Sequence, residues 1–408
     1  MTKMKIVWIS PYAPYDTVMH AGGKNHNFFV KYMSRKKDYN IKVLTICDKE
    51  EEDKLDLDQY GIMNSVVVRK AGIIKLCNIE SDLNPFHKFG GLVSNQREYL
   101  LKQLVISNRF EIEQADTIIL QWTESLILLP FIEKNRKKGC KIIAIEEDVT
   151  FLRYFRRYQA KKWIQRWALK KKYQKEKREE LAYLQRCNLI CCLNSKDKDL
   201  LIDNGINENK IIVIPPYFDD YSNINSSNDG YDIIFYGFMQ RKENESAVVW
   251  FIENVLPLLD TRYRFIVLGG KPSEQIKNKA CDRIIVTGYI KDISPYLESS
   301  LCMVVPLLLG AGIKVKILEA LSAGKIVLTN DIGVEGISLT NRENYFHCNT
   351  PQEYAVVITE IHENKELADY VSKNAKKFIN EKTKAESGLD RLGKYLLEGV
   401  VISDKESS

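Results

Sequence analysis

The sequence predicts an α/β protein built of two doubly wound domains, each with a parallel sheet flanked by helices, which face each other across a cleft. The chain of 408 residues is too long for one ordinary core. Short apolar, β-branched runs alternate with helical patterns in two successive series, as in repeated βαβ units. With 45% apolar and 28% charged residues, the composition is that of a globular protein.

The first series predicts seven strands. They span residues 5–9, 42–47, 65–69, 117–121, 140–146, 188–193 and 210–214. The first strand follows Lys3 and stops at Ser10 and Pro11, so it lacks the length and the cleavage pattern of a signal peptide. Pro215 and Pro216 end this alternation.

The second series begins after a polar, turn-forming stretch, 217–230, which predicts a linker. Its five strands are expected at 232–236, 264–268, 283–287, 301–305 and 326–329, with helices such as 247–259 and 313–323 between them. The predicted domains are therefore 1–216, which is expected to bind the acceptor substrate, and 231–385, which is expected to bind the donor. A helical tail at 386–408 is expected to cross back to the first domain.

Cysteines and histidines argue against a metal site. The nine cysteines are scattered, often inside apolar runs, and the five histidines are too dispersed for zinc or iron spacing. Reduced, structural cysteines favour a cytoplasmic protein. No apolar stretch approaches the roughly 20 residues that a membrane span needs.

Positive charge concentrates in the segment from Arg153 to Arg178, which contains twelve Lys/Arg and one acid. The segment carries +11, which leaves −5 for the rest of the chain. Six aromatic residues are interleaved with these charges, a mixture suited to an anionic membrane surface. A solvated helical hairpin is the alternative interpretation, because the aromatic residues fall into two sectors of a helix. A nucleic-acid site is not expected, since no recognition motif accompanies the charge.

The most informative stretch is PLLLGAGIKVKILEALSAGKIVLTNDIGVEG, residues 306–336. It runs from a strand end through a glycine-rich loop, a helix and a strand to a second glycine loop, where doubly wound sheets bind ligands. Gly310 and Gly312 allow a close backbone approach, and a helix beginning near Ile313 offers N–H groups to an anion. Lys314 and Lys316 in its first turn oppose the helix dipole, which favours a diphosphate ligand.

Other interpretations of this stretch remain open. It also fits a plain βαβ crossover with solvated lysines. Dinucleotide binding is disfavoured because Val315 occupies the third glycine position of the Gly-x-Gly-x-x-Gly pattern, although Asp331 follows the next strand. A Walker loop is excluded by the absence of Gly-Lys-Ser/Thr.

These motifs resemble the retaining glycosyltransferases of family 4, which have the GT-B fold, and in particular a bacterial branch that builds envelope polysaccharides. The resemblance covers nearly the whole chain. It rests on three features. They are the opening strand and the glycine loop with Gly22 and Gly23, the segment GFMQRKENESAVVWF that begins at Gly237, and the block Gly-x-Gly-x-Lys-x-Lys-x-Leu-Glu-Ala-Leu-x-Ala-Gly followed by Gly-x-Glu-Gly, here Gly333 to Gly336.

The resemblance implies a sugar transfer from a nucleotide diphosphate sugar to a glycan or lipid-linked acceptor, with no cofactor and no metal. Lys242 and Lys316 match the basic pair that grips the diphosphate and stabilises the leaving nucleotide, and Glu319 matches the glutamate that holds the ribose. The remaining donor-binding positions that it implies are Gly23, Gly237, Gly310, Gly312, Ile313, Lys314, Gly333 and Glu335.

Two departures from the family pattern leave the donor sugar open. The family often has a second glutamate eight positions before the first, where this chain has Ala311. A histidine that often follows the strand corresponding to 140–146 is replaced by Glu147 and Asp148. These acids either orient a substrate, and so join the catalytic residues, or Asp148 simply caps a helix.

Two other functions compete with transfer. One is an NAD-dependent enzyme that modifies nucleotide sugars, and the other is an inactive partner subunit of a true transferase. The pair Asp56 and Asp58 has the Asp-x-Asp form of a manganese site but lies in a strongly acidic loop, so we interpret it as solvated charge.

Overall fold

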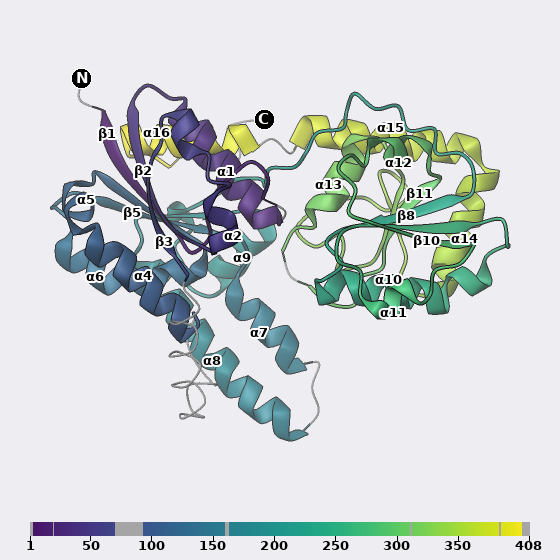
Figure 1. Cartoon of the computed structure of the whole chain (residues 1–408), viewed down its shortest axis with the longest axis horizontal. Coiled ribbons are helices and arrows are strands. Elements are labelled where there is room, and N and C mark those ends of the chain that lie inside the picture. Colours follow the sequence, from purple (N-terminus) through teal and green to yellow (C-terminus); the bar gives the residue numbers. More distant parts are fainter. Residues whose placement is uncertain are drawn as a thin grey trace. The chain divides into compact units, whose positions relative to one another are not determined.

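The computed structural model describes residues 3–18, 20–69, 93–159, 163–310, 312–382 and 385–401. The chain divides into two compact units, one formed by residues up to Pro215 together with those from Ala385 onward, and the other by Pro216–Lys384 (Figure 1). Each unit is described by itself below.

The first unit contains a seven-stranded parallel sheet in the order β3-β2-β1-β4-β5-β6-β7. Its strands are β1 (Met4–Ser10), β2 (Tyr39–Cys47), β3 (Met63–Val68), β4 (Thr117–Gln121), β5 (Lys141–Glu146), β6 (Leu189–Cys192) and β7 (Ile211–Val213). The central strands are buried on both faces, which explains their unbroken apolar runs. From β1 the chain order of the strands runs toward one edge of the sheet, and from β4 it runs toward the other edge. A ligand of this unit is therefore expected between β1 and β4, beyond the carboxyl ends of the strands.

Helices flank this sheet. They are α1 (Ala21–Ser34), α2 (Lys49–Glu52), α4 (Asn95–Ser107), α5 (Arg109–Gln114), α6 (Leu129–Asn135), α7 (Thr150–Gln159), α8 (Trp163–Arg186), α9 (Ser195–Asp203) and α16 (Ala385–Glu398), with short 3₁₀ turns at Leu57–Tyr60, Thr123–Leu128 and Glu208–Lys210. The C-terminal helix α16 packs against β7 and α1. A Cβ on Gly388 would lie 2.7 Å from the Cα of Ile214, so a glycine allows this close packing.

The second unit contains a six-stranded parallel sheet in the order β10-β9-β8-β11-β12-β13. Its strands are β8 (Asp232–Tyr236), β9 (Arg264–Leu268), β10 (Ile284–Gly288), β11 (Cys302–Val305), β12 (Val327–Thr329) and β13 (Phe346–His347). Its helices are α10 (Lys242–Asn254), α11 (Glu274–Lys277), α12 (Ser294–Ser299), α13 (Val315–Ser322), α14 (Pro351–Glu363) and α15 (Lys365–Lys382), with a 3₁₀ turn at Leu256–Leu258. The order reverses between β8 and β11.

The stretch 217–230, predicted as a linker, has no helix or strand but lies on the second unit. Phe218, Tyr221 and Ile224 pack against the core of that unit. The Tyr221 N–H donates to Ser322 Oγ at 2.9 Å. These apolar side chains, interspersed among small polar residues, keep the segment on the surface of the second unit.

The predicted fold class is confirmed. All twelve predicted strands occur in the described part of the chain. Eleven of them have both ends within two residues of the observed ends, while β2 begins three residues before the predicted start at 42. β13, only two residues long, was missed. Its shortness explains the miss, because two residues show no periodicity. Among the helices that the structure describes, none is both long and apolar enough to span a bilayer.

Candidate functional site

The helices that follow β8 and β11 begin beside each other at the switch point of the second sheet. α10 begins at Lys242 and α13 at Val315, after two neighbouring strands. Lys316 in α13 donates to Asn244 Oδ1 in α10 at 2.7 Å, which joins the two helix starts. The predicted residues Lys316, Gly237 and Glu319 are therefore gathered at one edge of this sheet.

The glycine loop continues two residues further than the sequence suggested. Gly312 has a φ of 69° and Lys314 is the N-cap of α13, so the helix begins at Val315 and not at Ile313. Lys314 is thus outside the first turn, and its Nζ donates back to the Gly312 carbonyl. The left-handed backbone of Gly312 delays the helix, a change of chain direction that a pattern of apolar residues does not reveal. Ala311 lies outside the described residues.

The ammonium group of Lys316 is enclosed by an aromatic ring and by the backbone after β8. Its Nζ lies 4.2 Å from the centre of the Phe235 ring. A Cβ on Gly237 would approach that nitrogen to 2.6 Å, so the backbone after β8 runs against it. Burial, and next the nearby Arg241, lower the pKa of Lys316 to about 7. Burial makes the charged form of this lysine unfavourable in the ligand-free protein, and a bound anion would stabilise that charged form.

Glu319 lies one turn further along α13, where 6% of it is exposed. Its Oε2 accepts the Tyr236 hydroxyl at 2.8 Å. The same hydroxyl lies 2.7 Å from the Lys316 carbonyl. Burial raises the pKa of Tyr236 well above its usual value, followed in effect by the charge of Glu319. The Tyr236 hydroxyl thereby holds the Glu319 carboxylate in place.

Lys242, the second predicted cation, is exposed at the first position of α10. The turn between β8 and α10 is narrow, because a Cβ on Gly269 would lie 1.8 Å from the Gly237 carbonyl oxygen. Gly237 in turn donates its N–H to the Leu268 carbonyl at 3.0 Å. Two glycines thus allow the loops after β8 and β9 to touch beside Lys316.

The second glycine loop follows β12. A Cβ on Gly333 would lie 1.8 Å from Thr329 Oγ1, and the Gly333 N–H donates to the Asn330 carbonyl at 2.9 Å. Asn330 also donates from its Nδ2 to the Leu307 carbonyl at 2.7 Å. This bond ties the loop to the segment after β11. Glu335 is buried, with 7% of it exposed.

Binding of a nucleoside diphosphate is expected to weaken as pH rises above 7. At lower pH Lys316 is already charged in the free protein, since its pKa is about 7. Above that pH the protein must take up a proton on binding, because the anion raises the lysine pKa, and affinity falls about tenfold per pH unit. Isothermal titration from pH 7 upward measures this slope. Lys316→Ala should remove the slope and Lys373→Ala should keep it; a wild type without a slope would contradict the assignment.

Glu147, one of the predicted acids, lies just past the carboxyl end of β5 in the first unit. Its Oε2 accepts Asn25 Nδ2 from α1 at 2.8 Å, and its Oε1 accepts Gln121 Nε2 from the end of β4 at 2.7 Å. Burial raises the pKa of Glu147 to about 8. At neutral pH the side chain is therefore mostly a neutral acid that can both donate and accept a hydrogen bond.

Gly23, another predicted residue of this unit, lies in the first turn of α1. Its N–H donates to Nδ1 of His20, the N-cap residue, at 2.9 Å. A Cβ there would lie 2.4 Å from Val18 Cγ2, so the position requires glycine for packing. The helix begins one residue earlier than the glycine pair, which the sequence had suggested as a loop.

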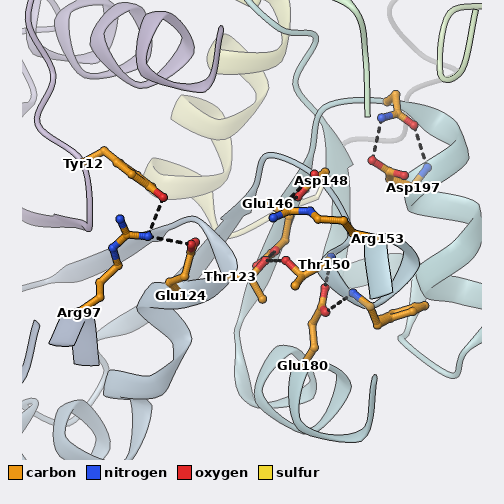
Figure 2. Close-up of polar contacts among 12 residues, drawn as sticks. Tyr12, Arg97, Thr123, Glu124, Glu146, Asp148, Thr150, Arg153, Glu180 and Asp197 are labelled. Atoms are coloured by element: carbon orange, nitrogen blue, oxygen red, sulfur yellow. Dashed lines mark hydrogen bonds and ion pairs between the residues drawn. The ribbon is translucent and has the colours of Figure 1, made fainter. Parts of the chain in front are cut away.

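Asp148 does not cap the following helix, so that alternative interpretation is wrong. Its carboxylate pairs with Arg153, at 2.6 and 2.8 Å (Figure 2). α7 is instead capped by Glu180 of α8, which accepts the N–H groups of Thr150 and Phe151 at 2.9 and 2.8 Å. The capping carboxylate comes from a residue 30 positions away in the sequence, so local sequence could not identify it.

A second buried acid, Glu146, joins this network from the end of β5 (Figure 2). It accepts the hydroxyl of Thr123, which accepts the hydroxyl of Thr150 at 2.9 Å. Its Oε1 is buried with no hydrogen-bond partner within the described residues. Burial raises the pKa of Glu146 to about 8 and that of Glu180 well above its usual value. Hydroxyls thus link the sheet edge to the start of α7.

An aromatic group that was not predicted from the sequence lies at the same edge. Trp122 follows β4 with φ 65° and ψ 148°, a backbone conformation that is essentially restricted to glycine and costs about 1–3 kcal/mol. Its ring meets that of Tyr12 edge to face at 4.9 Å. Arg97 donates to the Tyr12 hydroxyl at 2.7 Å and pairs with Glu124 at 3.3 Å (Figure 2). Tyr12 and Trp122 come just after β1 and β4, which are neighbours in the sheet. This position in the sequence could have identified them as candidate site residues.

Within the described part of the chain, no group of three or more His, Cys, Asp or Glu side chains is arranged to hold a metal ion. Asp56 of the Asp-x-Asp sequence accepts Lys31 Nζ at 2.8 Å, and its Oδ2 accepts the N–H of Asp16 at 2.9 Å. Asp56 therefore fastens the loop before β3, while Asp58 is exposed.

Comparison with protein families finds one match, to the group described as glycosyl transferases group 1, over residues 230–364. This stretch holds all the predicted donor-binding residues of the second unit. A comparison with curated proteins found no match.

Solved structures resemble the chain over almost its whole length. The Anabaena protein Alr3699/HepE in complex with UDP is 14% identical with a TM-score of 0.67, and covers 97% of this chain and 100% of its own. Sucrose-phosphate synthase from Thermosynechococcus elongatus is 12% identical, with a TM-score of 0.69 and coverages of 97% and 99%. WaaG, a glycosyltransferase involved in lipopolysaccharide biosynthesis, is 11% identical, with a TM-score of 0.64 and coverages of 97% and 100%. The chain therefore has the two-domain GT-B fold, and its second unit carries the match to the group 1 glycosyl transferases.

Proposed function

We propose that this protein is a retaining glycosyltransferase that moves a sugar from a nucleotide diphosphate sugar to a glycan or lipid-linked acceptor. The observation that carries the proposal is the enclosed Lys316, held between two helix starts at the switch point of the second sheet. The match of residues 230–364 to the group 1 model supports it. So does the similarity to a protein solved in complex with UDP-glucose.

In the proposed reaction the bond between the anomeric carbon and the β-phosphate oxygen breaks, and the acceptor hydroxyl oxygen bonds to the same face of that carbon. The hydroxyl proton passes to the β-phosphate oxygen of the leaving nucleotide. Lys316 and Lys242 stabilise the negative charge that develops on the diphosphate, so no metal ion is required. Glu319 accepts hydrogen bonds from the ribose.

For the first unit we propose acceptor binding near Glu147. A carboxyl with a pKa of about 8 is protonated at neutral pH and can donate to a sugar hydroxyl or ring oxygen. The edge-to-face aromatic pair of Tyr12 and Trp122 supports this assignment, since aromatic rings pack against the apolar faces of sugars. A role in cell-envelope polysaccharide synthesis at the cytoplasmic side of the membrane follows from a lipid-linked acceptor.

A thermal-shift screen against UDP, GDP, ADP, CMP and dTDP tests donor binding. We expect one nucleotide diphosphate to raise the melting temperature of the wild type and to leave Lys316→Ala unchanged, in the presence of EDTA as in its absence. The stabilising nucleotide then selects the nucleotide sugars for a product assay, in which the anomeric configuration is read by NMR.

Stabilisation by none of the nucleotides would contradict the proposal and favour an inactive partner subunit. Equal stabilisation of both proteins would place the nucleotide elsewhere. Loss of binding in EDTA would contradict metal-independent transfer, and NAD bound to the purified protein would favour the alternative enzyme that modifies nucleotide sugars.

A further inference from the structure

Helices α7 and α8 pack side by side as a hairpin that extends from the first sheet (Figure 1). We call the segment from Arg153 to Arg178 the basic arm. Three of its aromatic rings hold the two helices together. The Phe155 ring lies 5.9 Å from that of Tyr158 and 5.2 Å from that of Tyr173, and the two tyrosine rings are parallel within 4°. The arm is therefore a packed element and not a loose charged loop.

This packing accounts for the two sectors of aromatic residues in the sequence. One sector forms the contact between the helices. The other includes Trp167, which is 63% exposed, with Lys171 Nζ 3.8 Å from its ring centre. An exposed indole next to an ammonium group is suited to the interface between water and lipid, where the ring enters the headgroup region and the charge stays with the phosphates.

The charge on the solvent side of the arm is nearly all of one sign. Glu176, the acid within the arm, is fully buried, and so is Glu180 just beyond it, where it caps α7. Lys170, Lys171 and Arg178 are exposed. Glu179, just past the arm, lies 3.8 Å from Lys175. Within the described part of the arm, folding thus buries the acid and leaves Lys170, Lys171 and Arg178 on the surface.

We propose that the basic arm binds the surface of an anionic lipid bilayer. Clustered lysines and an exposed tryptophan match such a surface in charge and in polarity. Single-stranded nucleic acid is favoured less, because it needs exposed rings on which bases stack, and three rings of the arm pack against one another instead. The inference deepens the proposed function, since a lipid surface is where a lipid-linked acceptor resides.

The base of the arm connects this surface to the sheet edge. Arg153 in the first turn of α7 pairs with Asp148, and Thr150 donates to Thr123 beside Glu146. Glu180 holds the two helices of the arm together at the same point. A protein docked through the arm therefore has the acids at the end of β5 fixed relative to the bilayer.

Co-sedimentation of the full chain with lipid vesicles tests the inference. We expect binding to vesicles of phosphatidylcholine with about one third phosphatidylglycerol, weakening with added salt, and little binding to phosphatidylcholine alone. Replacing Lys170, Lys171 and Lys172 by Glu should lower the affinity at least about tenfold. Trp167→Ala should lower it by a smaller factor. The matched control replaces the exposed residues Lys291, Lys373 and Lys377 by Glu, which changes net charge equally and should leave binding nearly unchanged.

Undiminished vesicle binding by the arm variant would overturn the inference, and so would an equal loss in the control. Tight binding to DNA without binding to vesicles would also overturn it and assign the arm to nucleic acid. The assay contains no nucleotide sugar, so its failure leaves the proposed glycosyl transfer untested, whereas an absent nucleotide thermal shift contradicts transfer alone. An unchanged melting temperature of the arm variant shows that it is folded.

Discussion

Replacing Lys316 by alanine is expected to lower kcat about 10²–10³-fold, the loss typical when one preorganised group that stabilises developing charge is removed. The lysine lies between the turn after β8 and the start of α13, with its Nζ 2.7 Å from Asn244 Oδ1 and 4.2 Å from the Phe235 ring centre. Lys242, the other predicted member of the basic pair, is exposed at the start of α10. Steady-state kinetics with the donor found in the nucleotide screen measure the effect.

Lys373→Ala is the matched control, because this lysine is exposed on α15 and takes no part in the site. It should retain the wild-type kcat. A kcat for Lys316→Ala within about threefold of the wild type would exclude Lys316 as the group that stabilises the leaving nucleotide. A higher KM with an unchanged kcat would reassign it to ground-state binding of the donor.

Replacing Gly269 by alanine is expected to destabilise the second unit by about 3 kcal/mol and to abolish nucleotide binding. The added Cβ would lie 1.8 Å from the carbonyl oxygen of Gly237, a backbone atom that cannot rotate away. Relief requires the turn after β8 to move, and that turn runs against Lys316 Nζ. Urea denaturation of the full chain measures the stability, and calorimetry measures the nucleotide affinity.

Gly270→Ala provides a control one residue away. A Cβ at that position would meet its nearest atom, Cβ of Tyr289, at 3.6 Å, which is ordinary van der Waals contact. The free energy of unfolding should therefore change by less than about 1 kcal/mol. Similar behaviour of the two variants would show that the contact between Gly269 and Gly237 does not determine the shape of the site.

Strand positions were predictable because buried parallel strands are continuous apolar runs that stop at polar turns. The predicted strands 117–121, 232–236 and 264–268 coincide with β4, β8 and β9. The start of α13 was not predictable to the residue, because the left-handed turn at Gly312 delays it. The stretch 217–230 was predicted as a linker because small polar residues dominate it. Its packing depends on three apolar side chains that contact core residues of the second unit far away in the sequence.

The same distinction applies to the site. Two glycines followed by Lys314 and Lys316 at the start of a helix indicated an anion site, because lysines there oppose the helix dipole unless an anion offsets them. Trp122 comes directly after the predicted strand 117–121, and nothing in the sequence indicates its strained backbone, which only the tertiary structure shows. The capping of α7 was equally hidden, since a local N-cap at Asp148 and a distant one at Glu180 satisfy the same N–H groups.

The sequence by itself determined the α/β class, the two series of strands and the concentration of positive charge from Arg153 to Arg178. These properties depend on periodicity and composition, which can be read from one stretch of sequence without knowing what it contacts. Only the tertiary structure decided which groups meet: Lys316 with Asn244, Glu147 with Asn25 and Gln121, and the burial of Glu176 that leaves the arm positive. Such contacts join residues far apart in the chain, and burial, which shifts the pKa of Lys316 and Glu147, exists only once the surrounding elements have packed.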